Sequence, residues 1–151
     1  MKKSIIFIFA LFVLFSCKQE NEYFRLNDLS EDTESWLYEL YVMTAPSSNL
    51  DTLAKDIASF VRKNSFDKVA NKQYYGMFYR ETWNTPRDYE EDHSYFDDVI
   101  ADHLDDLIGV VEKERGEWSV KVKIRNNPDE WKRYFVTDSL TIIFNRDPFG
   151  N

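Results

Sequence analysis

Residues 117–125 read Glu117-Trp118-Ser119-Val120-Lys121-Val122-Lys123-Ile124-Arg125 and carry the clearest structural pattern of the chain. Apolar and polar side chains alternate strictly along it. A period of two places the two kinds of side chain on opposite faces of an extended chain. The stretch therefore predicts a β-strand with one buried face and one polar face.

The residues just before it, 107–116, are compatible with two structures. Val110, Val111 and the pair Arg115-Gly116 favour a strand that turns into a hairpin. The alternative is a helix that continues through Leu107 to Val111 and ends at Gly116. We favour the hairpin, and the helix stays open as the alternative.

Downstream, the chain predicts a meander of short strands. We expect a turn at residues 126–129, a strand at 131–136, a tight turn at 137–138 and a last strand at 140–144. Consecutive strands joined by turns this short pair in antiparallel fashion. The C-terminal third of the chain therefore predicts antiparallel sheet.

Upstream, residues 48–64 predict an amphipathic helix. Its apolar residues recur at helical spacing, Ser48 and Asp51 form a capping-box pattern, and Arg62 and Lys63 oppose the negative end of the helix dipole. Residues 36–43 favour a strand, with a helix capped at Ser30 as the alternative.

Residues 74–82 predict a further strand, and residues 83–93 a long loop. A second helix is expected from a cap at Ser94, with an apolar stripe that reaches Leu104 and Leu107. Together these elements predict an α+β fold: two amphipathic helices packed on a mainly antiparallel sheet with a C-terminal meander.

Composition limits the functions that this fold can serve. The 151 residues are 43% hydrophobic and carry a net charge of -8, which argues against a disordered chain and against a nucleic-acid partner. Four glycines, none clustered, build no phosphate-binding loop, and we expect no cofactor.

The N-terminus predicts export. Lys2 and Lys3 precede an unbroken apolar run over residues 5–15, and Ser16 stands before Cys17. This is the layout of a secretory signal peptide, and the run is too short to span a membrane, which needs about 20 residues.

Cys17 is the only cysteine of the chain, so it forms no internal disulfide. Leu14-Phe15-Ser16-Cys17 resembles the lipobox of bacterial lipoproteins, and the acid-rich stretch from Cys17 to Glu22 resembles surface-exported lipoproteins of the Bacteroidota. The resemblance implies lipidation of Cys17 after cleavage. It implies an anchor in the outer membrane of a Gram-negative bacterium, on the periplasmic or the surface-exposed face.

This interpretation divides the chain into three parts. Residues 1–16 form the signal peptide, residues 17–34 the lipidated cysteine and a flexible acidic tether, and residues 35–151 a single α+β domain. The resemblance covers the N-terminal segment only and says nothing about the fold of the domain.

Aromatic residues are the first candidates for a binding site. Tyr75, Tyr79 and Trp83 share one face of the strand at residues 74–82, and Tyr89 follows in the loop. Flat rings presented to solvent bind sugars or partner side chains, because they bury a large area at a small entropic cost. The alternative is that these rings are core.

Charged residues are the second group of candidates. The stretch 89–106 holds eight acids and both histidines, and an oxygen- or nitrogen-ligated metal would use His93, Asp97, Asp102, His103 and Asp106. The alternative is a solvated acidic face. Basic residues near the C-terminal strands either balance these acids or form an anion-binding patch: Lys121, Lys123, Arg125, Lys132 and Arg133.

The sequence therefore predicts a membrane-anchored lipoprotein that binds a protein or a glycan and is not an enzyme. One alternative is a small hydrolase that uses the acidic residues or a metal. Another is a protective lipoprotein that neutralises a toxin or an enzyme, for which an acidic surface suits a basic target.

Overall fold

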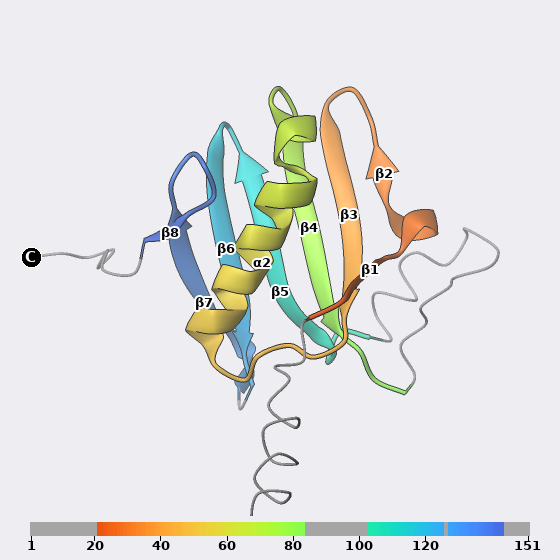
Figure 1. Cartoon of the computed structure of the whole chain (residues 1–151), viewed down its shortest axis with the longest axis vertical. Helices are drawn as coiled ribbons and strands as arrows, with labels where there is room; N and C mark the ends of the chain where they lie inside the picture. Colours follow the sequence, from red (N-terminus) through yellow and green to blue (C-terminus); the bar gives the residue numbers. More distant parts are fainter. Residues whose placement is uncertain (1–20, 84–102, 126, 144–151) are drawn as a thin grey trace, which may run out of the picture.

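A computed structural model of the chain describes residues 21–83, 103–125 and 127–143. In this part of the chain, one α-helix lies on a mainly antiparallel sheet of eight strands (Figure 1). The order of the strands along the sheet is β1-β3-β4-β5-β6-β7-β8, and β2 pairs with β3 as well.

The hairpin that the sequence favoured is confirmed. β5 (Leu107–Glu114) and β6 (Glu117–Ile124) are antiparallel, with Glu114 opposite Glu117. The two residues between them, Arg115 and Gly116, have φ angles of 52° and 87°. Positive φ at both positions is the geometry of a type I′ turn, whose twist matches that of the strands. The alternative of a continuing helix is wrong.

The alternation along β6 places its apolar and its polar side chains on opposite faces, as the sequence predicted. Trp118, Val120 and Val122 are buried in the core beneath the helix. Lys121 and Lys123 lie on the opposite face and are only partly exposed. β6 therefore separates a core face from a polar face.

The meander is confirmed, with shifted boundaries. β7 (Asn127–Val136) pairs with β6, and β8 (Ile142–Ile143) pairs with β7. The turn expected at 126–129 is wrong for residues 127–129, because the register shifts between Lys123 and Ile124 and brings Asn127 opposite Ile124. The strand expected at 140–144 starts later, because Leu140 has a φ of 56° and lies in the preceding turn.

Residues 36–43 form a strand, as the sequence favoured, and the helix capped at Ser30 is wrong. β3 (Trp36–Met43) pairs in parallel with β4 (Gln73–Arg80). The strand expected at 74–82 is therefore confirmed, but it begins one residue earlier and ends two residues earlier. Parallel neighbours need a long crossover connection, usually a helix. Here α2 (Leu50–Asn64) and the short 3₁₀ helix η2 (Phe66–Val69) form that crossover.

The predicted helix is confirmed, and its cap lies one residue later than expected. Asn49, not Ser48, caps α2, because the Asn49 Oδ1 atom accepts a hydrogen bond of 2.9 Å from the backbone N–H of Thr52. Arg62 and Lys63 lie in the last turn, as predicted.

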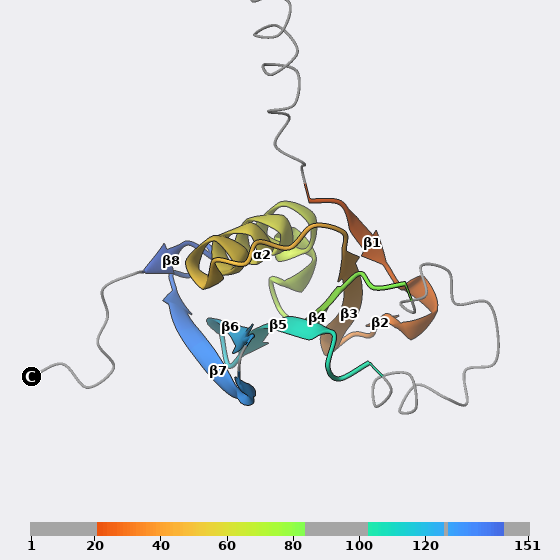
Figure 2. The same cartoon turned by 90° about the horizontal axis from the view of Figure 1, so that it is seen from below.

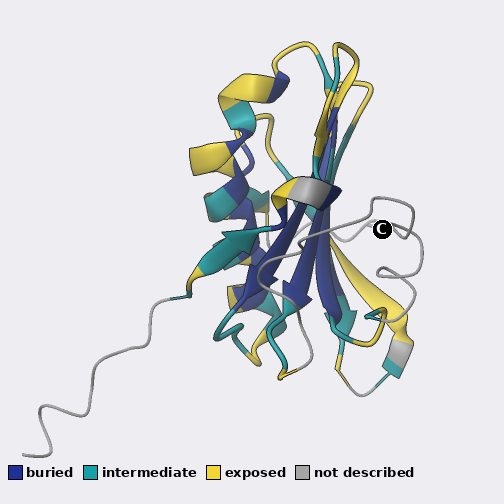
Figure 3. Cartoon of the chain, turned by 90° about the vertical axis from the view of Figure 1, so that its right-hand side faces the viewer, coloured by how far each residue is buried: buried dark blue, intermediate teal, exposed yellow. Residues whose placement is uncertain are grey.

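α2 lies on one face of the sheet (Figures 1 and 2). Its buried stripe includes Ile57 and Val61, which pack against Phe78 and Val120. In Figure 3 the buried side of α2 faces the sheet and its exposed side faces away. The packing is close at Gly109, where a Cβ would lie 2.5 Å from the Ile57 Cδ1 atom and the end of the Ile57 side chain would have to move.

The N-terminal segment corrects the expected tether. β1 (Tyr23–Arg25), the 3₁₀ helix η1 (Asn27–Leu29) and β2 (Glu31–Asp32) belong to the folded domain, since both strands pair with β3. Leu26 and Leu29 are buried in a second apolar cluster, which also includes Leu40, Met77 and Tyr79. The domain therefore begins before residue 35.

The second helix is not found among the described residues. Residues 103–106 form a turn in which the Asp106 N–H donates to the His103 carbonyl, and Leu107 begins β5. The helical stripe predicted to reach Leu107 is therefore wrong at its C-terminal end, because Leu107 is the first residue of a strand. Residues 94–102, and residues 84–93 of the loop expected at 83–93, lie outside the described residues.

Candidate functional site

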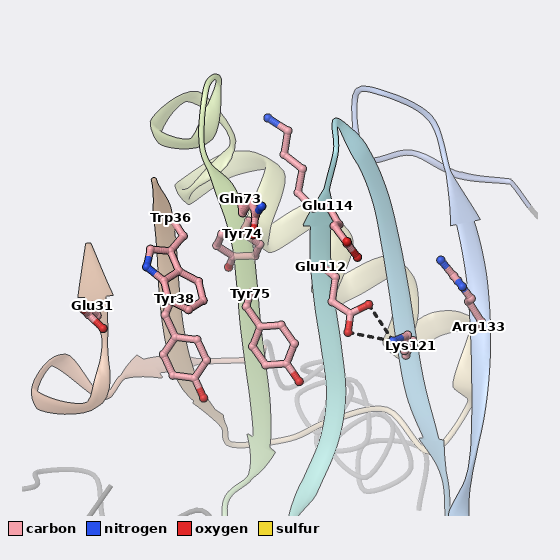
Figure 4. Close-up of a pocket in the computed structure, with 11 residues that line it drawn as sticks. Glu31, Trp36, Tyr38, Gln73, Tyr74, Tyr75, Glu112, Glu114, Lys121 and Arg133 are labelled. Carbon is pink, nitrogen blue, oxygen red and sulfur yellow. Dashed lines mark hydrogen bonds and ion pairs between the residues drawn. The ribbon is translucent and has the colours of Figure 1, made fainter. Parts of the chain in front are cut away.

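A groove of about 700 Å³ lies on the face of the sheet opposite to α2 (Figure 4). It extends over β2, β3, β4, β5, β6 and β7, each of which contributes a side chain. The second apolar cluster, with Leu26 and Leu29, covers the neighbouring part of this face. The groove is the part of the sheet that neither α2 nor the N-terminal segment covers. We call it the open-face groove.

Three aromatic side chains form one end of the groove. Trp36 is 50% exposed, and Tyr38 and Tyr75 are partly exposed. Tyr38 and Tyr75 are partners in the parallel β3–β4 register, with ring centroids 5.5 Å apart and ring planes inclined by 5°. Figure 4 looks onto this face of the sheet, and the flat sides of the three rings are turned toward the viewer. We call Trp36, Tyr38 and Tyr75 the aromatic platform.

A hydrogen bond and apolar packing fix the two tyrosine rings of the platform. The Tyr38 hydroxyl donates to the Met77 Sδ atom at 2.9 Å, and both tyrosines pack against the second apolar cluster. Partial burial, with the Glu112 carboxylate nearby, raises the pKa of Tyr75 above its ordinary value. The Tyr75 hydroxyl therefore stays protonated and able to donate a hydrogen bond throughout the physiological pH range.

Charged side chains form the other end. The Lys121 amino group lies 2.7 Å from the Glu112 carboxylate, and this pair stands on the neighbouring strands β5 and β6 (Figure 4). Arg133 on β7 is exposed and makes no ion pair within the described residues. Its guanidinium lies 5.8 Å from the centre of the Phe135 ring. The groove thus joins an aromatic surface to hydrogen-bonding side chains.

A second hollow of about 320 Å³ continues from the groove. It shares Glu112, Glu114 and Arg133 with the groove and reaches Arg115 and Glu117 at the end of the hairpin. The combined surface therefore crosses the strands from β2 to β7 and is long enough for an extended molecule.

The structure describes three of the four aromatic residues that the sequence singled out, and it places these three in different environments. Tyr75 belongs to the platform. Tyr79 shares its face but is 3% exposed, because the N-terminal segment packs over it, so Tyr79 is core and not a binding residue. Trp83 is 94% exposed and lies beyond the end of β4, away from the residues that line the groove. Tyr89 lies outside the described residues.

The candidate metal ligands are described only in part. The His103 Nδ1 atom lies 3.4 Å from the Asp106 Oδ2 atom, and Asp106 also accepts a hydrogen bond from Thr82. Within residues 21–83, 103–125 and 127–143, no three histidine, cysteine or acidic side chains gather around one point. His93, Asp97 and Asp102 lie outside that part of the chain, as does Cys17.

The basic residues of the C-terminal strands are mainly paired within the fold. Lys121 pairs with Glu112, Lys132 lies 2.7 Å from the Asp51 carboxylate, and Lys123 donates to the Leu104 carbonyl. These three side chains therefore have partners within the fold, but their partners among the described residues are not the acids of the stretch 89–106 that they were expected to balance.

Sequence reasoning missed most of the groove. It did not single out Trp36, Tyr38, Gln73 or Glu112 as site residues, and it treated Arg133 only as a member of the basic group. The alternation of Trp36 and Tyr38 along their strand was a usable signal, since residues two apart share a face. The missing information was that β3 is the neighbour of β4.

Comparison of the chain with protein-family models, with curated proteins and with solved structures found no match. In the described residues, no helix combines the length and the apolar character that crossing a bilayer requires.

Proposed function

We propose that the protein is an exported lipoprotein, anchored in the outer membrane by acyl chains on Cys17, and that its domain binds a protein or a glycan in the open-face groove. The observation that carries the binding role is the exposure of the aromatic platform. Trp36 leaves half of its surface in solvent beside two partly exposed tyrosines. Rings that are already held in place bind with little loss of conformational entropy.

The shape of the groove supports a binding role. Ligand sites are concave, have volumes of roughly 300–1,000 Å³ and combine apolar walls with a few polar groups. The open-face groove, at about 700 Å³, has its apolar wall in the platform and its polar groups in Gln73, Glu112 and Lys121.

The anchoring part of the proposal rests on the lipobox resemblance of residues 14–17 and on the single cysteine. Because β1 begins at Tyr23, five residues separate Cys17 from the first strand. Fully extended, they span at most about 18 Å. A lipidated Cys17 would therefore hold the domain close to the membrane surface.

The binding role is tested with an array that carries both short peptides and oligosaccharides, probed with the full-length chain in detergent. We expect at least one class of probe to bind, and we expect Trp36→Ala to abolish that binding. Trp83→Ala is the matched control, because it removes an even more exposed indole outside the groove. If Trp83→Ala abolished binding and Trp36→Ala did not, the groove would not be the site.

The anchor is tested separately with Cys17→Ser. We expect the wild-type protein to sediment with membranes and to carry the mass of acyl chains, since two or more chains hold a protein stably. The Cys17→Ser protein should be released or should keep its uncleaved leader. An unchanged mass and unchanged partitioning would rule out lipidation.

A further inference from the structure

We propose that the open-face groove binds a neutral oligosaccharide, which lies across the strands with one sugar ring on the aromatic platform. This inference rests on the proposed function, because it names the class of ligand for the same groove. Three features of the groove favour a glycan over a peptide: the platform, the pairing of the strands beneath it, and the balance of its charges.

The platform suits the flat apolar face of a sugar ring. The Tyr38 and Tyr75 ring planes are inclined by only 5°, and Trp36 lies on the same strand face, two residues from Tyr38. Figure 4 shows the three rings turned toward the open side. Aromatic faces bury apolar area at a small entropic cost, and the C–H groups on one face of a pyranose ring supply such area.

The four central strands beneath the groove offer no free edge. β3, β4, β5 and β6 each lie between hydrogen-bonded neighbours in the sheet. A peptide that binds by adding a strand needs the unpaired backbone groups of such an edge. A ligand that lies over paired strands must be bound by side chains alone. An oligosaccharide, which carries hydroxyl groups around each ring, meets that condition.

Side chains that bind hydroxyl groups flank the platform. Gln73 is exposed on β4 beside Tyr75, and its amide can donate and accept at the same time. The Glu112 carboxylate on β5 lies two strands from Tyr38, and the Lys121 amino group on β6 lies three strands away (Figure 4). Because they pair with each other at 2.7 Å, they are oriented before a ligand arrives.

The charges of the groove favour a neutral ligand. Equal numbers of carboxylates and cations line it: Glu31, Glu112 and Glu114 against Lys113, Lys121 and Arg133. Two of the cations already have partners, since Lys113 donates to the carbonyls of Val69 and Ala70 and Lys121 pairs with Glu112. Within the part of the chain that the structure describes, Lys121 has a carboxylate partner, and a polyanion would also meet the three carboxylates of the groove in a chain of net charge -8.

The extent of the surface favours several sugar units. From β3 to β7 the sheet has four strand spacings, which correspond to roughly 19 Å. The second hollow extends the surface toward Arg115 and Glu117 at the end of the β5–β6 hairpin. A single sugar would cover the platform and leave the charged end empty.

The test is calorimetric titration of the full-length chain in detergent with neutral hexasaccharides of glucose, mannose and N-acetylglucosamine. Acidic oligosaccharides that contain uronic or sialic acid, and the peptides of the array, form the comparison arms. We expect at least one neutral hexasaccharide to bind, and we expect Trp36→Ala to weaken its binding by about tenfold or more. Gln73→Ala should weaken binding by a smaller factor, and Trp83→Ala should leave it within about twofold.

Each other outcome overturns the inference in a distinct way. If peptides bind in place of sugars and Trp36→Ala abolishes that binding, the glycan is wrong and the proposed binding role stands. If only acidic oligosaccharides bind, and Arg133→Ala removes that binding, the neutral ligand is wrong. If the folded chain binds no member of any arm, both the inference and the proposed binding role fail. Circular dichroism of each variant shows that it is folded.

Discussion

At the residue scale, Glu39 is a fully buried carboxylate among polar partners. It accepts hydrogen bonds from the Arg25 Nε atom and the Tyr74 hydroxyl, both at 3.2 Å, and from the Ser65 hydroxyl. Lys68 lies 3.9 Å away. Ser65 and Tyr74 are themselves buried. The cluster joins β3, β4 and the end of α2.

We expect Glu39→Ala to lower the free energy of unfolding by about 3 kcal/mol, because it leaves two buried hydroxyl groups without their acceptor. Urea unfolding measures the change. The control is Glu114→Ala, whose side chain is 74% exposed and should matter by less than about 0.5 kcal/mol. Equal effects of the two variants would show that the buried cluster does not stabilise the fold.

Asp51 makes stability depend on pH. Hydrogen bonds from the Lys132 amino group and the Tyr134 hydroxyl lower the pKa of Asp51 below its ordinary value of 3.8. In the same group of side chains, burial and the hydrogen bond to Asp51 raise the pKa of the Tyr134 hydroxyl to about 12. A carboxyl whose pKa is lowered by folding stabilises the fold above its unfolded pKa, and it loses that contribution as the pH falls through the folded value.

We therefore expect Asp51→Asn to be less stable than the wild type at neutral pH. The difference should shrink as the pH falls below 3.8. Urea midpoints over a pH series measure it, with the exposed Asp138→Asn as the control. A difference that stayed constant or grew toward low pH would contradict the assigned ion pair.

At the element scale, the β5–β6 hairpin contains a residue that does not suit its turn. Arg115 has a φ of 52°, a left-handed conformation that costs a side chain with a Cβ about 1–2 kcal/mol and that asparagine tolerates better. We expect Arg115→Asn to raise the free energy of unfolding by about 0.5–1 kcal/mol. We expect Gly116→Ala, at a φ of 87°, to lower it by about 1–2 kcal/mol.

Urea unfolding of both variants, compared with the wild type, tests the turn. If Arg115→Asn were destabilising, or if Gly116→Ala were neutral, the hairpin would not have a type I′ turn.

Elements with a long local period were predictable from the sequence. The alternation of β6 and the apolar stripe of α2 each extend over enough residues to reveal which face is buried. β1 and β2 contain three and two residues, too few for a period, so their acidic surroundings suggested a tether. They are strands because β3 offers them a free edge, which is tertiary information.

The candidate site was less predictable for the same reason. Tyr75 was identified from its own strand, but Tyr38 becomes its neighbour only through the parallel pairing of β3 and β4. The burial of Tyr79 depends on Leu26 and Leu29, which are far away in sequence. A pattern within one strand gives the face of a side chain and not what covers that face.

At the scale of the whole molecule, the two faces of the sheet differ in what covers them. α2 covers one face and completes the main core. On the other face, the N-terminal segment covers the apolar part and leaves the open-face groove in solvent. We therefore expect the protein to bind its ligand in this groove.

The four tryptophans provide a direct test, because each reports on a different place. Trp36 lies in the groove, and Trp118 is buried beneath α2. Trp131 is 36% exposed on β7, next to the edge strand β8, and Trp83 is 94% exposed beyond the end of β4. Each indole N–H gives its own resonance in a ¹H–¹⁵N correlation spectrum. The measurement is a titration with the neutral hexasaccharide that binds best in the calorimetric series. We expect the resonance of the Trp36 indole to shift, while those of Trp83 and Trp118 stay in place. A shift of the Trp83 indole with an unmoved Trp36 would contradict this expectation.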